Sequence, residues 1–216
     1  MIGGASNQDP NIPRAIPPQG RSLKKLCGKL VAARALKPDL PLRLMFQDEA
    51  RFGRMNVPTV CWAPHGIRPE VPVQLVREYG YVFGAVSPQD GKFVSLVFPR
   101  CDNETMSLHL DEISKRFPSE HVLIFMDKAA WHTTKKLVIP PNLTIDHLPP
   151  YSPQCNPQEL VWGLLRREPF GNVCFNSMDD LEDALVKALH DLENSTETLQ
   201  SLTSFPWIIT SLQMAS

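Results

Sequence analysis

Three acidic residues occupy positions from which carboxylates could hold metal ions. Asp48 follows a short apolar run over residues 42–46, Asp127 follows a second run over 121–126, and Glu159 follows an Asn-Pro pair. Mg²⁺ prefers hard oxygen ligands such as carboxylates. Two such ions, roughly 3.5–4 Å apart, neutralise charge on the attacking and leaving oxygens when a phosphodiester is cut in line. The three acids are therefore candidates for metal-dependent cleavage of nucleic acid.

The same acids also have plainer structural explanations. Acids are common where a strand ends and a loop begins, and Asp127 could cap a helix that follows it. Glu159 comes three residues after Asn156, with Pro157 at the first helical position, which fits a capping box. Spacing alone leaves the catalytic and the structural interpretations both open.

A metal site would need the two aspartates at the ends of neighbouring strands. The runs 42–46 and 121–126 have the length and composition of buried strands. Rigid strand ends hold ligands more precisely than loops do. Asp48 is followed directly by Glu49, and adjacent residues of a strand point to opposite faces. Only one of these two acids can therefore face the site.

The other patterns along the chain predict a mixed α/β sheet flanked by helices. Turn residues Ser-Pro-Gln-Asp-Gly at 87–91 are typical of a hairpin between two strands. Further strands are predicted at 59–63, 71–76, 79–86, 92–98 and 143–147. Helices are predicted from 103 or 105 to 117, around 132–137, from 157 onward and over 178–193.

The N-terminal part of the chain is basic. Residues 1–37 hold seven Lys or Arg and one acid, a charge of +6, while the other 179 residues hold 15 basic and 22 acidic side chains, or −7. Residues 22–36 predict a helix with an apolar stripe formed by Leu23, Leu26, Leu30, Ala33 and Leu36. This helix could contact DNA phosphates, or it could be a linker helix with a solvated face.

The cysteines and the hydropathy pattern indicate a globular cytoplasmic protein. Five scattered cysteines without a C-x-x-C pair predict buried, reduced thiols; they are Cys27, Cys61, Cys101, Cys155 and Cys174. No stretch reaches the roughly 20 apolar residues that span a bilayer, and no apolar signal segment follows Met1. We therefore expect no membrane partner.

Three segments resemble the acidic blocks of bacterial insertion-sequence transposases of the mariner-like superfamily. They are QDEARFG (47–53), MDKAAWHTT (126–134) and LPPYSPQCNPQELVWGLLRRE (148–168). CWAPHGIRP (61–69), FGAVSPQDG (83–91) and SLTSFPWI (201–208) are also similar to that family, so the resemblance covers about residues 38–210. It implies an RNase H-like DDE catalytic domain with a mixed five-stranded sheet. The expected division is a flexible basic extension (1–40), the catalytic domain (41–195) and a C-terminal tail (196–216).

The resemblance also implies a reaction and its partners. Asp48, Asp127 and Glu159 would hold two Mg²⁺ or Mn²⁺ ions for hydrolysis of a strand at the transposon end, after which the 3′-hydroxyl attacks target DNA. The implied partners are DNA, a second copy in a synaptic complex and a separate N-terminal helix-turn-helix protein. The implied location is the bacterial nucleoid. Plausible DNA neighbours are Arg51, Lys128, His132, Arg166 and Arg167.

Several features depart from the family pattern or have a second interpretation. Lys128 stands where Asn is common, and the 31 residues between Asp127 and Glu159 are few for the family. About 40 residues precede the catalytic block, too few for the helix-turn-helix region, so weak and sequence-tolerant DNA binding is expected. His132 could equally pack beside its neighbour. The tryptophans predicted to be scaffold are Trp62, Trp131 and Trp162.

Two other functions fit the same sequence. An RNase H-like nuclease would use the same three acids to cleave strands without joining them. A truncated, non-catalytic fragment would bind or regulate a full-length transposase instead.

Overall fold

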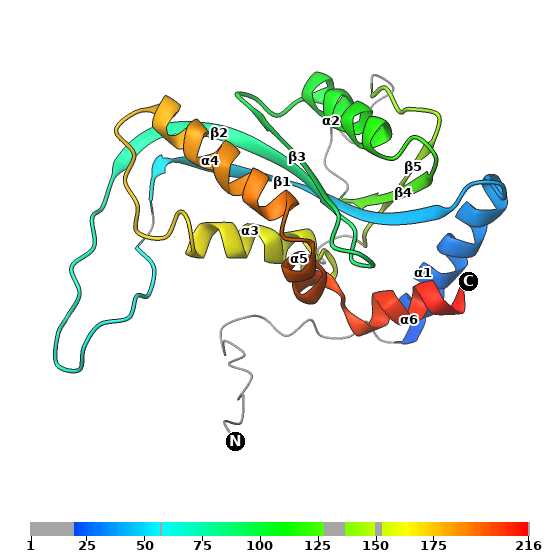
Figure 1. Cartoon of the computed structure of the whole chain (residues 1–216), viewed down its shortest axis with the longest axis horizontal. Helices are drawn as coiled ribbons and strands as arrows, with labels where there is room; N and C mark the ends of the chain where they lie inside the picture. The colour runs from blue at the N-terminus through cyan, green and yellow to red at the C-terminus, as the bar shows by residue number, and fades with distance from the viewer. Residues whose placement is uncertain (1–19, 57, 128–136, 150–152, 216) are drawn as a thin grey trace.

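A mixed five-stranded sheet forms the centre of the structure, as predicted (Figure 1). The computed structural model describes residues 20–56, 58–127, 137–149 and 153–215. The sheet order is β3-β2-β1-β4-β5, with β1 antiparallel to β2, β2 antiparallel to β3, β1 parallel to β4 and β4 parallel to β5. The strands are β1 (Leu42–Met55), β2 (Leu75–Val86), β3 (Phe93–Phe98), β4 (His121–Met126) and β5 (Leu143–His147).

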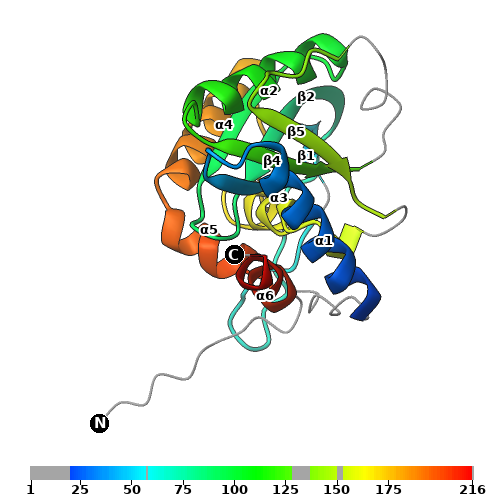
Figure 2. The same cartoon turned by 90° about the vertical axis from the view of Figure 1, so that its right-hand side faces the viewer.

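Helices cover both faces of this sheet. On one face lies α2, which buries Met106, Leu110 and Ile113 against β1–β4. The other helices pack on the opposite face (Figures 1 and 2). The helices are α1 (Gly20–Leu36), α2 (Asn103–Arg116), α3 (Gln158–Arg167), α4 (Met178–Glu193), α5 (Thr196–Thr203) and α6 (Pro206–Met214), with a 3-10 turn η2 (Pro153–Cys155) before α3.

The first part of β1 is apolar at successive positions because helices cover both faces of the strand there. Leu44 and Phe46 pack with α1 and α6, whereas Met45 packs with α2 on the other face. A strand covered on both faces needs apolar residues at every position, which produces an uninterrupted run. Phe46 pairs with Phe125 of β4, and their rings stack at 5.7 Å between centroids. The run therefore ends where apolar cover ends, just before the acidic segment.

Two predicted strands differ in the structure. Residues 59–63 and 71–74 lie in an exposed connection between β1 and β2, and β1 itself continues to Met55. Val60 is 99% exposed and Trp62 102% exposed, so the scaffold prediction for Trp62 was wrong. A β-prone segment forms a strand only when a partner pairs with it, and the described residues offer 59–63 none.

The other tryptophan predictions have different outcomes. Trp162 is 1% exposed, which confirms its predicted role in the core. Residues 128–136 lie outside the described part of the chain, and they include Lys128, Trp131, His132 and most of the helix predicted around 132–137. Residue 137 is described and is not helical.

All five cysteines are free thiols, as predicted, but their predicted burial was wrong. Cys61 is exposed because it lies in the β1–β2 connection, and the other four are half-buried. Among the helices that the structure describes, none is both long and apolar enough to cross a membrane.

The two ends of the described chain pack together on one face. Helix α1 buries Leu26, Leu30 and Ala33 of its predicted stripe, whereas Leu36 is exposed. Trp207 and Ile208 of α6 belong to the same cluster, so α1 and α6 lie side by side (Figure 2). Residues 196–214 are thus mostly helical and contribute to the core.

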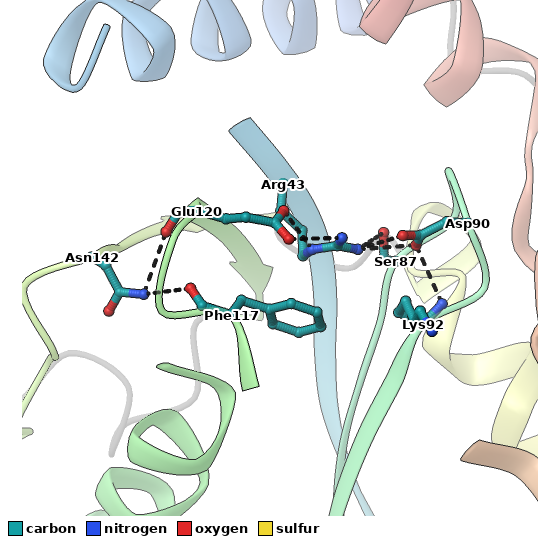
Figure 3. A network of polar contacts seen from close by, with 7 residues as sticks. All are labelled: Arg43, Ser87, Asp90, Lys92, Phe117, Glu120 and Asn142. Atoms are coloured by element: carbon teal, nitrogen blue, oxygen red, sulfur yellow. Dashed lines mark hydrogen bonds and ion pairs between the residues drawn. The ribbon is translucent and has the colours of Figure 1, made fainter. Parts of the chain in front are cut away.

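A buried arginine at the start of β1 joins three parts of the fold (Figure 3). The Arg43 guanidinium bonds Glu120 through Nε (2.9 Å), and Asp90 (2.7 Å) and Ser87 (3.3 Å) through one terminal nitrogen. It also lies 4.2 Å from the Phe117 ring centroid. Burial lowers its pKa, but the hydrogen bonds that it donates to Glu120 and Asp90, together with the negative charges of these carboxylates, outweigh burial and leave the pKa of Arg43 raised.

Arg43→Lys should destabilise the protein, because an ammonium cannot reproduce the planar fork that reaches both carboxylates. We expect a loss of about 1–2 kcal/mol in the free energy of unfolding, measured by urea denaturation. The matched control is Arg116→Lys, an arginine that also reaches two carboxylates, Glu112 (2.7 Å) and Glu193 (3.4 Å), but is half exposed; it should change stability by less than about 0.5 kcal/mol, because solvent screens its ion pairs. Equal losses in the two variants would contradict the role assigned to Arg43.

Candidate active site

Asp48 interrupts the apolar face of β1 that faces α3. Phe46 belongs to the cluster under α1 and α6, and Ala50 belongs to the cluster under α3 and α4. Asp48 lies between them in the alternation, and Trp162 Nε1 of α3 donates a hydrogen bond of 3.1 Å to its Oδ2. Glu49 belongs to the opposite face, where it accepts from Gln47 Nε2 at 3.1 Å. The two adjacent acids thus belong to opposite faces of the sheet, as predicted from strand alternation.

The surroundings of Asp48 disfavour the charged form of its carboxyl group. Its pKa is raised from an ordinary value of 3.8 to about 8, mainly by burial and also by the negative charges of Glu159 and Glu49. The hydrogen bonds from the Glu49 backbone and from Trp162 act in the opposite direction but are weaker. A desolvated carboxylate beside like charges is stabilised when a cation arrives.

Asp127 ends the neighbouring parallel strand. Phe46 pairs with Phe125, and each aspartate comes two residues after its phenylalanine, so Asp48 and Asp127 lie at matching positions just past the paired part of β1 and β4. Asp127 follows the last residue of β4, but β1 continues to Met55, so the prediction that Asp48 lies beyond the end of its strand was wrong. The Asp127 residue is exposed. Its backbone carbonyl accepts a hydrogen bond of 3.0 Å from His147 Nδ1 at the end of β5.

Glu159 lies in the first turn of α3, with its side chain exposed. The helix begins at Gln158, one residue later than predicted, and Asn156 Oδ1 accepts from Gln158 N at 3.1 Å. Asn156 Nδ2 also donates to Gln47 O of β1 at 3.3 Å. Asn156 therefore fixes the start of α3 to the strand that carries Asp48.

A glycine allows α3 to approach the sheet at this point. Gly84 of β2 pairs directly with Asp48, and a methyl group placed on it would lie 2.6 Å from Trp162 Cη2 and 2.8 Å from Gln158 Nε2. Any larger residue would push α3 away from β1. The close approach of Trp162 to Asp48 depends on this absence of a side chain.

The donor set suits a hard divalent cation, because all three predicted ligands are carboxylates. Asp48 and Glu159 are brought into electrostatic contact, and Asp127 lies at the end of the adjacent strand. Within the described ranges, however, no three His, Cys, Asp or Glu side chains are gathered closely enough to hold a metal ion together.

The predicted DNA neighbours that the structure describes are exposed arginines on two elements. The Arg51 guanidinium lies 4.4 Å from the Tyr79 ring centroid, and that of Arg166 lies 5.5 Å from the Phe52 ring centroid. Arg167 Nε donates to Gly163 O of its own helix at 3.2 Å.

Sequence reasoning missed the residues that hold the acids in place. Trp162 comes three residues after Glu159, which is the spacing of one helical face, so its proximity to the acids had a detectable signal. Gly84 and His147 act through pairing across the sheet, for which the local sequence contains no signal.

The strand order of the sheet is that of the RNase H-like fold, with Asp127 directly after β4 and Asp48 at the matching position within its longer parallel neighbour β1. The model of the family described as DDE superfamily endonuclease matches residues 43–182, well over half of the chain. The chain belongs to this family, and residues 43–182 form its DDE endonuclease domain. The matched segment contains Asp48, Asp127 and Glu159.

Individual relatives agree with this assignment. The uncharacterized protein y4pE/y4sA of Sinorhizobium fredii (strain NBRC 101917 / NGR234) is 38% identical over 130 residues, which are 60% of this chain and 96% of that protein. The Mos1 transposase paired-end complex with left transposon end matches with a TM-score of 0.56 at 13% identity, over 100% of this chain and 66% of that one. The Mos1 mariner paired end complex with Mn matches with a TM-score of 0.54 at 13% identity, over 100% and 67%. These structures share the fold, and this chain spans about two thirds of their length.

Gly84→Ala should displace α3 and destabilise the protein by about 1–3 kcal/mol, because the added methyl group meets Trp162 in a packed interface. The matched control is Gly163→Ala on α3, where a methyl group meets nothing within 4 Å. That variant should gain roughly 0.5–1 kcal/mol from helix propensity. Thermal or urea unfolding measures both, and a stable Gly84→Ala protein with unchanged Trp162 fluorescence would contradict the proposed packing.

In the absence of divalent metal, Asp48→Asn should remove one contribution to the pH dependence of the free energy of unfolding. Because the folded pKa of Asp48 is about 8 and its ordinary value is 3.8, the native state holds a proton that the unfolded state has released between these values. The wild type must therefore lose stability as pH rises from about 4 to 8.

The variant keeps an oxygen for Trp162 but lacks that charge, so it should be more stable than wild type by about 1–3 kcal/mol near pH 9 and by much less near pH 4. Urea unfolding in EDTA at both pH values measures the difference. The control Glu168→Gln, an exposed charge just after α3, should show no such gain. Parallel stability curves for wild type and Asp48→Asn would contradict the raised pKa of Asp48 in the folded protein.

Proposed function

We propose that this chain is the catalytic domain of a mariner-like bacterial insertion-sequence transposase, which cleaves DNA strands at transposon ends and joins them to target DNA. Asp48, Asp127 and Glu159 are its metal-binding carboxylates. The observation that carries the proposal is the dehydrated Asp48 carboxyl group, whose pKa is raised by burial and by Glu159. A protein built only for stability gains nothing from placing two acids together in a partly buried position.

The metal requirement follows from the same carboxylates. Mg²⁺ or Mn²⁺, two ions in the proposal, would supply the charge that the transferring phosphate and the attacking oxygen need. The Mos1 complex with Mn supports the choice of ion for a protein of this fold. Three hard carboxylates with no thiolate ligand favour these ions over softer metals.

The residues of the chain have distinct parts in this proposal. Trp162 orients Asp48 by donating to one of its oxygens, which leaves the other available for a ligand. Asn156 fixes the first turn of α3 to β1, so that Glu159 stays on the side of the sheet where Asp48 lies. Positioning of this kind, rather than covalent chemistry by a side chain, is what phosphoryl transfer requires of a protein.

The partners follow from the reaction. Transposon ends and target DNA are the substrates, and a second copy of the chain in a synaptic complex would bring two ends together. A separate helix-turn-helix protein would read the end sequence, and the bacterial nucleoid is the location. The Sinorhizobium fredii relative and the Mos1 complex with a transposon end support a bacterial element of this type.

Loss of any one of the three acids should abolish strand cleavage without unfolding the protein. Asp48→Asn, Asp127→Asn and Glu159→Gln each remove one charge at nearly constant shape, and each should lower the rate by at least about 100-fold. The substrate is a duplex of the flanking element end, tested with Mn²⁺ or Mg²⁺ and with a pre-cut end for joining. The matched control is Glu168→Gln, which should cleave at the wild-type rate.

The three possible functions predict different outcomes. Cleavage without joining of the pre-cut end would identify a nuclease rather than a transposase. Absence of both activities, together with no rise in melting temperature on adding Mn²⁺, would favour a non-catalytic fragment. Full cleavage by the Glu159→Gln variant would remove Glu159 from the site.

A further inference from the structure

A chain of hydrogen bonds connects the basic helix α1 to the main chain of Asp127. Lys29 Nζ lies 2.6 Å from Asp146 Oδ1 and 3.4 Å from His147 O, both at the end of β5. It also lies 5.1 Å from the centroid of the Phe125 ring, two residues before Asp127 on β4. One lysine of α1 therefore touches the ends of the two strands that flank the candidate site.

Asp146 connects Lys29 to His147. Its Oδ1 accepts from Lys29 and also from the backbone N of His147, at 2.7 Å. The turn at the end of β5 is thus fixed by a part-buried ion pair rather than by a free carboxylate. These contacts fix the backbone of His147, and the fixed backbone limits the directions in which its imidazole ring can point.

The ring of His147 completes the connection. Its Nδ1 lies 3.0 Å from the carbonyl oxygen of Asp127, and because a carbonyl only accepts, Nδ1 is the protonated nitrogen. β4 and β5 pair as far as Met126 and His147, so this bond extends the ladder by one further contact. It restrains the peptide that follows Asp127, and with it the direction of the Asp127 side chain.

We propose that His147 is a positioning residue for Asp127 and that Lys29 of α1 holds His147 in place. The inference rests on the proposed function, because it takes Asp127 as a metal ligand. Partners that hold a metal ligand from outside are known to change metal affinity or activity by 10–100-fold when removed. The basic helix α1 would then be part of the scaffold of the active site, with the charge of Lys29 committed to Asp146 rather than to a DNA phosphate.

The experiment compares metal binding in five forms of the full chain. His147→Leu removes the N–H donor, whereas His147→Asn keeps a donor near the position of Nδ1. Lys29→Met removes the ammonium but keeps the stem over Phe125, and Lys25→Met removes an exposed charge from the same helix. The readout is the Mn²⁺ concentration at half-maximal rise in melting temperature, together with cleavage at saturating DNA.

His147→Leu and Lys29→Met should each raise the Mn²⁺ midpoint about 10–100-fold and lower the maximal cleavage rate, with little change in the concentration of DNA required. His147→Asn should restore values near wild type, and Lys25→Met should leave the Mn²⁺ midpoint unchanged. Rescue by asparagine separates positioning from simple loss of stability, since both substitutions remove the ring.

Two results would overturn the inference while leaving the proposed function intact. One is a wild-type Mn²⁺ midpoint in His147→Leu, even if its melting temperature without metal falls. The other is a Lys29→Met variant that loses DNA affinity as Lys25→Met does but keeps the wild-type midpoint. A wild-type protein that neither responds to Mn²⁺ nor cleaves DNA would instead contradict the proposed function, and the inference with it.

Discussion

The Asp48 carboxyl group is partly buried and receives one side-chain hydrogen bond, from Trp162, and the arrangement of this face of the sheet depends on that contact. Trp162 can reach Asp48 only because Gly84 has no side chain on the paired strand. The indole is buried at the same time, so the helix that carries Glu159 is anchored by its apolar surface. One contact therefore couples core packing to the electrostatics of the site.

The parallel pairing of β1 and β4 supplies the second constraint. Parallel neighbours end at the same edge of a sheet, and their crossover through β2, β3 and α2 needs the long connection seen between residues 56 and 120. The apolar face of α2 fills the side of the sheet away from Asp48. The two aspartates thus lie at matching positions because β1 and β4 are parallel neighbours, whatever their local sequences are.

Much of this frame could be predicted from local patterns. β4, β5 and α4 have the predicted boundaries, since each is an apolar or amphipathic segment between clear turn or cap residues. The prediction of a strand at 59–63 was wrong. A strand forms only where another strand pairs with it, and the local sequence TVCWA does not indicate whether such a partner exists. The spacing of Trp162 from Glu159 indicates a shared helical face, but the hydrogen bond of Trp162 to Asp48 could not be predicted, because it depends on how closely the helix approaches the sheet. The alternation of Asp48 and Glu49 was predictable because strand periodicity is local.

Two charged residues on β1, five positions apart, show how a structural charge differs from a functional one. Arg43 is buried with two carboxylates and an aromatic face, and its partners raise its pKa, which favours the charged form. Asp48 also has a raised pKa, but for an acid this direction disfavours the charged form. Among the described residues Asp48 has acidic neighbours and an indole donor but forms no ion pair with a cation. The first charge on this strand is balanced by nearby partners, whereas the second is not, and this difference supports the proposal that Asp48 is a metal ligand.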